Sequence, residues 1–217
     1  MDDSATRRIS RADTEALFLA IEGIDDSGKT TLTAAMNDSL RGRGIKVAVH
    51  KEPSHGPIGV VFRHLSAAGG MPPMVMALLS AADRHEQQRA LAQHRRDCDV
   101  ILADRYYLSG LAYHAADGID PAEYQTLNRG VLKPTAYLYL DIDPALAADR
   151  GSGVPDDYWE QHGIAARLPD AYQSCLDLLA ETEAARVIRI EASQPPQRVL
   201  ESALAATLTL MPQGSRR

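Results

Sequence analysis

The chain has 217 residues, of which 45% are hydrophobic and 24% are charged, as is ordinary for one globular domain with a substantial core. Its formal net charge of −6 argues against a nucleic-acid partner, because phosphate backbones attract basic surfaces. No stretch approaches the roughly 18 apolar residues of a membrane span, and the polar N-terminus lacks the apolar block of a secretory signal. We therefore expect a cytoplasmic protein without a membrane partner, with flexible tails at residues 1–16 and 212–217.

Apolar runs alternate with helical patterns from residue 17 to residue 211. Strands are predicted at 17–22, 46–51, 99–104, 136–141 and 186–191, and helices at 29–41, 58–66, 73–95, 107–116, 121–131, 144–150, 165–183 and 195–209. This alternation predicts an α/β fold around a mostly parallel, five-stranded sheet. The near-continuous apolar character of the strands predicts helices over both faces, and hence a single three-layer α/β/α domain.

The first predicted strand leads into "GIDDSGKT" at residues 23–30, which satisfies the phosphate-loop pattern G-x-x-x-x-G-K-[ST]. Glycines let successive backbone N–H groups point at phosphate oxygens, and the following helix adds its positive N-terminal end. Lys29 is expected to reach the β- and γ-phosphates, and the Thr30 hydroxyl to ligate Mg²⁺. The expected ATP-binding residues are Gly23, Asp26, Ser27, Gly28, Lys29, Thr30 and Thr31.

The third predicted strand ends in Asp104, where a carboxylate can meet the Mg²⁺ shell at the carboxyl edge of the sheet. Thr30 and Asp104 are therefore the predicted metal ligands. Arg105 follows at once and offers a two-pronged donor that suits a phosphate. A polar segment rich in Gly, Pro and Asp at about 149–163 is predicted to form a short lid. Together these features predict the fold of the P-loop NTPases.

Five stretches occur in a characteristic order: "AIEGIDDSGKTTL", "KEPSHGPIG", "LLSAADRHEQ", "VILADRYYLSGLAYH" and "LKPTAYLYLDIDP". This set resembles the thymidylate kinases, P-loop enzymes that transfer the γ-phosphoryl group of ATP to dTMP. The resemblance covers about residues 17–191, and its most specific element is "DRYYLSGLAYH". It implies ATP and a nucleoside monophosphate, most directly dTMP, as substrates, Mg²⁺ as cofactor, and a homodimer.

The resemblance also implies roles for individual residues. Asp25 matches an acid between donor and acceptor, near the metal, and Arg105 matches an arginine that holds the acceptor phosphate. Arg84 matches an arginine that contacts the acceptor base, and Tyr113 a tyrosine that packs by the deoxyribose. The expected acceptor-binding residues are Asp25, Glu52, Pro53, Ser80, Arg84, Arg105, Gly110 and Tyr113.

Two positions depart from the family in ways that bear on its substrates. Ser80 stands where the family usually has a phenylalanine that stacks on thymine, and base–aromatic stacking is worth roughly 1–3 kcal/mol. Either another side chain covers the base, or the base differs from thymine. Asp26 stands at a loop position that is arginine in one subclass and neutral in the other. We expect Asp26 to face solvent or to accept hydrogen bonds from loop amides.

A third departure lies in the lid, where the family pattern Asp-Arg-x-Glu aligns with residues 157–160 and Tyr158 replaces the arginine. An arginine acting on the developing phosphoryl charge is worth about 10³ to 10⁵ in rate. Arg150 and Arg167 flank the lid and are the candidates to replace it. The expected catalytic residues are Lys29, Asp25, Arg105 and Arg150.

Three functions remain open from the sequence. The leading one is a nucleoside monophosphate kinase that converts dTMP to dTDP. The second is a kinase of the same fold that acts on a modified or different pyrimidine nucleotide, motivated by Ser80. The third is a non-catalytic, nucleotide-binding regulator, motivated by Tyr158 and Asp26.

Overall fold

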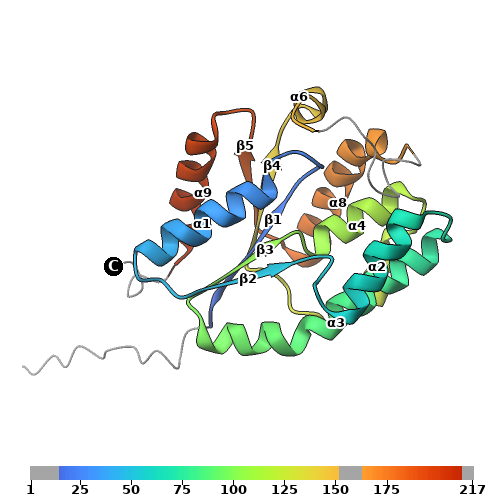
Figure 1. Ribbon diagram of the computed structural model, residues 1–217, viewed down its shortest axis with the longest axis horizontal. Coiled ribbons are helices and arrows are strands. Elements are labelled where there is room, and N and C mark those ends of the chain that lie inside the picture. Colours follow the sequence, from blue (N-terminus) through green and yellow to red (C-terminus); the bar gives the residue numbers. More distant parts are fainter. Residues whose placement is uncertain (1–14, 152–162, 212–217) are drawn as a thin grey trace, which may run out of the picture.

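The computed structural model describes residues 15–151 and 163–211. Within these ranges one sheet contains β1 (Leu17–Glu22), β2 (Val47–Lys51), β3 (Val100–Asp104), β4 (Ala136–Asp141) and β5 (Val187–Glu191). The strands pair in the order β2-β3-β1-β4-β5, and every pair is parallel (Figure 1). Each strand lies within one residue of its predicted bounds, so the predicted α/β class and strand set are confirmed.

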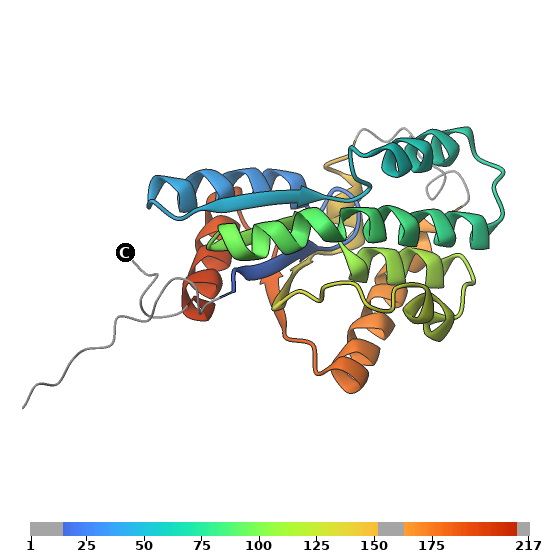
Figure 2. The same ribbon diagram turned by 90° about the horizontal axis from the view of Figure 1, so that it is seen from below.

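The described helices are α1 (Lys29–Gly42), α2 (Pro57–Ala68), α3 (Pro73–Asp97), α4 (Tyr107–Ala116), α5 (Pro121–Leu127), α6 (Pro144–Ala148), α8 (Leu168–Glu183) and α9 (Pro196–Leu210), with a short 3₁₀ helix, η2 (Ala165–Arg167), before α8. Several begin at a proline, whose fixed φ and missing N–H suit the first helical turn. Figures 1 and 2 show α1 and α9 on one face of the sheet and α4 and α8 on the other. The three predicted layers are therefore present.

The sheet brings polar residues from separate strands to one edge. β1 and β3 are buried along their whole length, and they are neighbours in the sheet. In a parallel sheet all carboxyl ends lie at the same edge, so Glu22, Lys51 and Asp104 meet there. Lys51 and Asp104 are directly paired in register. This edge is where the phosphate loop leaves β1.

Some predictions concern parts of the chain outside the described residues. These are residues 1–14 and 212–217 of the expected tails, and residues 152–162 of the expected lid, including Tyr158. The described chain begins just before β1, where Ala16 is buried and its amide donates to the Arg95 carbonyl oxygen at 2.9 Å. Among the helices in the described ranges, none has the length and apolar character needed to cross a membrane.

Candidate active site

The loop between β1 and α1 adopts the tight geometry that its glycines predict. Gly28 has φ +96° and Asp26 has φ +57°, both in the left-handed region. Aspartate is one of the few residues other than glycine that enters this region readily. An aspartate therefore suits the backbone at position 26, and Asp26 is exposed to solvent, one of the two alternatives that the sequence predicts. Its exposed carboxylate occupies the space that a Cβ on Gly151 would fill, at the start of the expected lid.

Lys29 lies inside the loop, as the motif predicts. Its side chain is 5% exposed, and Nζ donates to the Ile24 carbonyl oxygen and to Ser27 Oγ at 3.3 Å. Burial lowers the pKa of Lys29 to about 7, and the nearby Arg105 acts in the same direction. A phosphate that binds beside Lys29 would favour its protonated form, because the two opposite charges attract each other.

Thr30 and Asp104, the predicted metal ligands, are in direct contact. Thr30 Oγ1 donates to Asp104 Oδ2 at 2.7 Å, at the edge where β3 ends. A hydroxyl and a carboxylate suit Mg²⁺, which binds through few protein oxygens and completes its shell with water and phosphate. Within residues 15–151 and 163–211, no group of three or more His, Cys, Asp or Glu is placed to hold a metal on its own. The residues therefore fit a metal that arrives with a nucleotide.

Two cavities open at the carboxyl edge of the sheet. The loop-side cavity, of about 630 Å³, is lined by the phosphate loop, the start of α1, and the connection from β5 to α9. The helix-side cavity, of about 560 Å³, is lined by the end of β2 and by α2, α3 and α4. Asp25, Lys51 and Arg105 line both cavities. A ligand in one cavity would therefore meet a ligand in the other at these three residues.

Arg105 is turned toward the phosphate loop by its own backbone. Its φ is +65°, and its amide donates to the Ile21 carbonyl oxygen at 3.1 Å. The guanidinium forms an ion pair with Asp25 and lies 3.4 Å from the Gly23 carbonyl oxygen. Positive φ at a non-glycine residue costs of order 1–3 kcal/mol and persists where the surroundings hold it. The side chain thus stands between the cavities, as its predicted role requires.

Asp25 keeps its negative charge in this setting. Burial alone would raise its pKa, but the charges of Arg105 and Lys29 and a hydrogen bond from Tyr113 bring the pKa of Asp25 below its usual value. The Tyr113 hydroxyl donates to Asp25 Oδ2 at 2.5 Å. Sequence reasoning expected Tyr113 to pack by the acceptor sugar, and it does line the helix-side cavity. Its bond to Asp25 was not expected.

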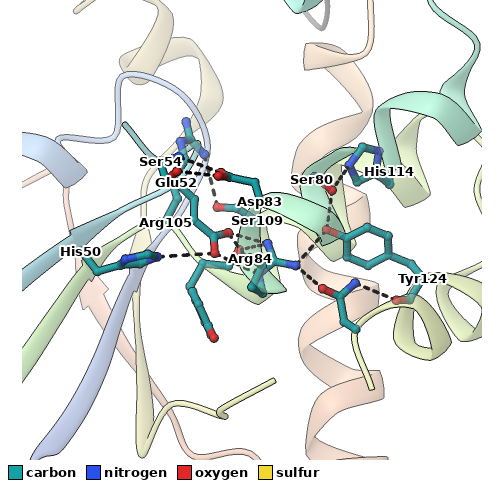
Figure 3. Close-up of polar contacts among 12 residues, drawn as sticks. His50, Glu52, Ser54, Ser80, Asp83, Arg84, Arg105, Ser109, His114 and Tyr124 are labelled. Carbon is teal, nitrogen blue, oxygen red and sulfur yellow. Dashed lines mark hydrogen bonds and ion pairs between the residues drawn. The ribbon is translucent and has the colours of Figure 1, made fainter. Parts of the chain in front are cut away.

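Arg84 lines the helix-side cavity, and its guanidinium group donates hydrogen bonds to several protein groups (Figure 3). It is 1% exposed, and its guanidinium grips both carboxylate oxygens of Glu52. Nη1 also donates to the Tyr124 hydroxyl at 3.0 Å and to Asn128 Oδ1 at 2.5 Å. Nη2 donates to the Tyr106 carbonyl oxygen at 3.3 Å. Because its donors are taken by protein groups, Arg84 in this state orders the cavity wall and has no N–H left for an acceptor base.

Ser80 belongs to a polar chain that continues from Arg84. Its Oγ lies 2.9 Å from the Tyr124 hydroxyl and 2.9 Å from His114 Nε2 (Figure 3). It also donates to the Ala77 carbonyl oxygen at 3.0 Å. Because the Ser80 hydroxyl directs its single proton to the Ala77 carbonyl oxygen, Ser80 accepts hydrogen bonds from Tyr124 and His114. Burial, with the charge of Arg84, lowers the pKa of His114 to about 3, so the ring is neutral. Sequence reasoning missed His114, although it ends the quoted stretch "DRYYLSGLAYH".

An aromatic side chain does line the helix-side cavity, from a different element than expected. Phe62 of α2 is buried and faces the cavity that Ser80 also lines. The sequence left open whether another side chain covers the base, and Phe62 is a candidate, although α2 is distant from Ser80 in the chain. Pro53 and Gly110 line the same cavity, and a Cβ on Gly110 would collide with the Tyr124 hydroxyl.

The two arginines that flank the lid take different positions. Arg150 lines the loop-side cavity, and its Nη2 donates to the Ala192 carbonyl oxygen at 2.9 Å. It is therefore held beside the connection from β5 to α9. Arg167 is exposed and is not among the residues that line either cavity. Neither arginine lies at the boundary where the two cavities meet.

A parallel sheet, a phosphate loop with its Thr–Asp pair, and two cavities that share Arg105 define a nucleotide kinase of the P-loop class. The family model of thymidylate kinase matches residues 21–203. The chain belongs to the thymidylate kinase family.

Several thymidylate kinases are similar to this chain. A thymidylate kinase of Xanthomonas oryzae pv. oryzae (strain PXO99A) is 33% identical over 192 residues, covering 87% of this chain and 82% of that protein. A thymidylate kinase of Xylella fastidiosa (strain 9a5c) is 33% identical over 199 residues, covering 90% and 92%. A probable thymidylate kinase of Pyrobaculum calidifontis is 41% identical over 137 residues, covering 62% and 68%.

Proposed function

We propose that the protein transfers the γ-phosphoryl group of ATP to dTMP and forms ADP and dTDP, with Mg²⁺ as cofactor. An oxygen of the acceptor phosphate forms the new bond to the γ-phosphorus. The bond from that phosphorus to the bridging oxygen breaks, and its electron pair leaves with ADP. The observation that carries the proposal is that two nucleotide-sized cavities meet at Asp25, Lys51 and Arg105, in a chain of the thymidylate kinase family.

In this proposal ATP occupies the loop-side cavity, with its terminal phosphates against Lys29. Thr30 and Asp104 would hold Mg²⁺, which would neutralise phosphate charge when bound. The acceptor occupies the helix-side cavity, with its phosphate toward Arg105. Arg150 binds the donor nucleotide from the lid side. Catalysis is then positional and electrostatic, since a loose phosphoryl-transfer transition state needs little covalent help.

A coupled ADP-release assay tests this function with a panel of nucleoside monophosphates. We expect dTMP to give the highest kcat/KM. Lys29→Ala should lower kcat by at least about 10²–10³-fold, because it removes a preorganised cation from the phosphates. The exposed Lys46, which directly precedes β2 at the edge of the sheet away from the site, provides the control Lys46→Ala, which should match wild type. Turnover by Lys29→Ala near the wild-type rate would show that the phosphate-loop assignment is wrong.

A second candidate acceptor follows from Ser80 and His114. Ser80 stands where the family usually presents an aromatic face, and its partner His114 lines the same cavity, so the cavity wall there is polar. A pyrimidine nucleotide with an additional polar substituent on its base would exploit that wall. The same panel decides between the two acceptors: dTMP leads under the first proposal, and a modified pyrimidine nucleotide leads under the second. Tight ATP binding without ADP formation for any acceptor would instead identify a regulator.

A further inference from the structure

Lys51 has no role in the sequence reasoning, yet it occupies the centre of the site. It ends β2, and its ammonium group lies 3.0 Å from Asp104 Oδ2 and 3.5 Å from Thr30 Oγ1. The Lys51 side chain is 44% exposed, whereas the Asp104 side chain is 5% exposed. With Asp25 and Arg105, Lys51 lines both cavities. Among the residues that the structure describes, Lys51 and Arg105 are the cations that line both cavities, at the boundary where phosphoryl transfer is proposed.

The transferring group needs a cation at the boundary between the cavities, where neither of the two arginines that flank the lid lies. Charge spreads over three phosphoryl oxygens in the transition state. The sequence has no lysine or arginine between Arg150 and Arg167. Arg150 is bound to the Ala192 carbonyl oxygen, and Arg167 lines neither cavity. Lys51 therefore lies where a cation could stabilise the negative charge of the transferring phosphoryl group.

Lys51 is also able to move to that charge. Arg105 is committed to Asp25 by an ion pair, whereas Lys51 carries a compact ammonium group on a flexible four-carbon stem. Its present partner, Asp104, is the carboxylate that fits Mg²⁺ beside Thr30. The Lys51 ammonium group and a divalent ion cannot both contact Asp104 Oδ2 without strong repulsion, because two cations bound to one oxygen lie close together. In the loaded site the ammonium group must find another anion.

We propose that Lys51 is a catalytic residue: its ammonium group leaves Asp104 when the nucleotides bind and donates to the oxygens of the phosphoryl group in transfer. This inference rests on the proposed function and adds one residue to it. In the ligand-free protein Lys51 neutralises Asp104. In the loaded protein Lys51, at the end of β2, stabilises the developing phosphoryl charge, as the lid arginine of the family pattern does.

The test compares Lys51→Met, which keeps length and removes charge, with Lys51→Arg, which keeps charge. Steady-state kinetics at saturating Mg²⁺ should show kcat lower by about 10²–10³-fold in Lys51→Met, with both KM values within about threefold of wild type. Calorimetry provides a second measurement: the complex of ADP, aluminium fluoride and dTMP should weaken by a similar factor. ADP alone and dTMP alone should bind as to wild type.

Controls separate a catalytic role from a structural one. Lys51→Arg should recover kcat to within about tenfold of wild type, since one cation replaces another. Lys46→Met removes a lysine that directly precedes β2 and lines neither cavity, and it should match wild type in every measurement. Lys51→Gln repeats the charge loss should the methionine variant fold poorly.

Outcomes for the two proposals differ. Active wild type with an equally active Lys51→Met, or with a Lys51→Met that differs only in its Mg²⁺ requirement, overturns the role of Lys51 and leaves the proposed function intact. A wild-type protein that neither phosphorylates a monophosphate nor binds the fluoride complex overturns both.

Discussion

At the scale of single residues, two glutamates of the site have pKa values shifted in opposite directions, because their hydrogen-bond and ion-pair partners differ. Glu22 and Glu52 are both buried carboxyl groups at the ends of strands or just beyond them. Burial would raise both pKa values, but the Arg84 guanidinium brings the pKa of Glu52 below its usual value. Glu22 meets the Ser109 hydroxyl and the Tyr106 amide, which are weaker partners. Burial therefore raises the pKa of Glu22 to about 7.

This raised pKa predicts a pH-dependent stability. Between pH 4.5 and about 7 the folded protein binds more protons at Glu22 than the unfolded chain does. The free energy of unfolding from this group therefore falls as pH rises through that window. Urea denaturation across the window should show this decline in wild type and not in Glu22→Gln. The exposed Glu201 offers the control Glu201→Gln, which should keep the wild-type slope, and a decline that survives in Glu22→Gln would contradict the assignment.

At the scale of elements, α3 carries predicted acceptor-binding residues to the wall of the helix-side cavity. The predicted helix 73–95 is confirmed as Pro73–Asp97, and its first half carries Ser80 and Arg84 into the space beside α4 and α5. The predicted helix 121–131 ends earlier, at Leu127, and Asn128 beyond it turns back to Arg84. Gly130 follows with φ +88°, which favours an end to the helix. These three helices position the wall of the proposed acceptor site.

The close approach of α4 to α5 predicts the effect of a single methyl group. In Gly110→Ala, the added Cβ would collide with the Tyr124 hydroxyl and lie 3.0 Å from Arg84 Nη2. The Tyr124 side chain must then shift, and with it the packing of α4 against α5 beside the helix-side cavity. We expect the KM for dTMP to rise by about tenfold or more and the affinity for ATP to stay within about threefold, since small displacements of positioning groups cost up to about 10²-fold.

Kinetics in both substrates check this prediction. Gly42→Ala is the matched control, because a Cβ at that helical position meets nothing within 4 Å. Equal dTMP kinetics in Gly110→Ala and Gly42→Ala would mean that the contact between α4 and α5 does not shape the acceptor site.

At the scale of the whole molecule, helices α2 and α3 lie side by side (Figure 2) and carry exposed apolar side chains. Val60 and Val61 are 52% and 46% exposed on α2, and Val75 and Leu78 are 37% and 48% exposed on α3. Exposed apolar side chains on neighbouring helices favour an interface. We propose that this surface joins two copies in the homodimer that the family resemblance implies.

Light scattering with size-exclusion chromatography tests the dimer. The wild-type protein should elute with twice the 23.6 kDa mass of the chain. Leu78→Lys combined with Val61→Lys should elute as a monomer, because two charges would be buried without partners. Lysine at the exposed Leu146, on α6, is the control and should leave the mass unchanged. A dimer that survives the double substitution would place the interface elsewhere.

Local patterns in the chain determined much of this protein. The five strands, most helix bounds, the phosphate loop and the pair of Asp104 and Arg105 could be predicted, because each depends on residues close together in sequence. Asp25 and Arg105, matched through the family, do meet at the boundary between the cavities.

Only the tertiary structure decided which distant groups meet. Lys51 reaches Asp104 through strand pairing, Phe62 enters the cavity from α2, and Arg84 is held by Glu52. No local period or motif encodes these distances, because they follow from how helices pack on the sheet. The backbone likewise explained Asp26, since a left-handed φ is a property of the folded loop and is not legible in the residue alone.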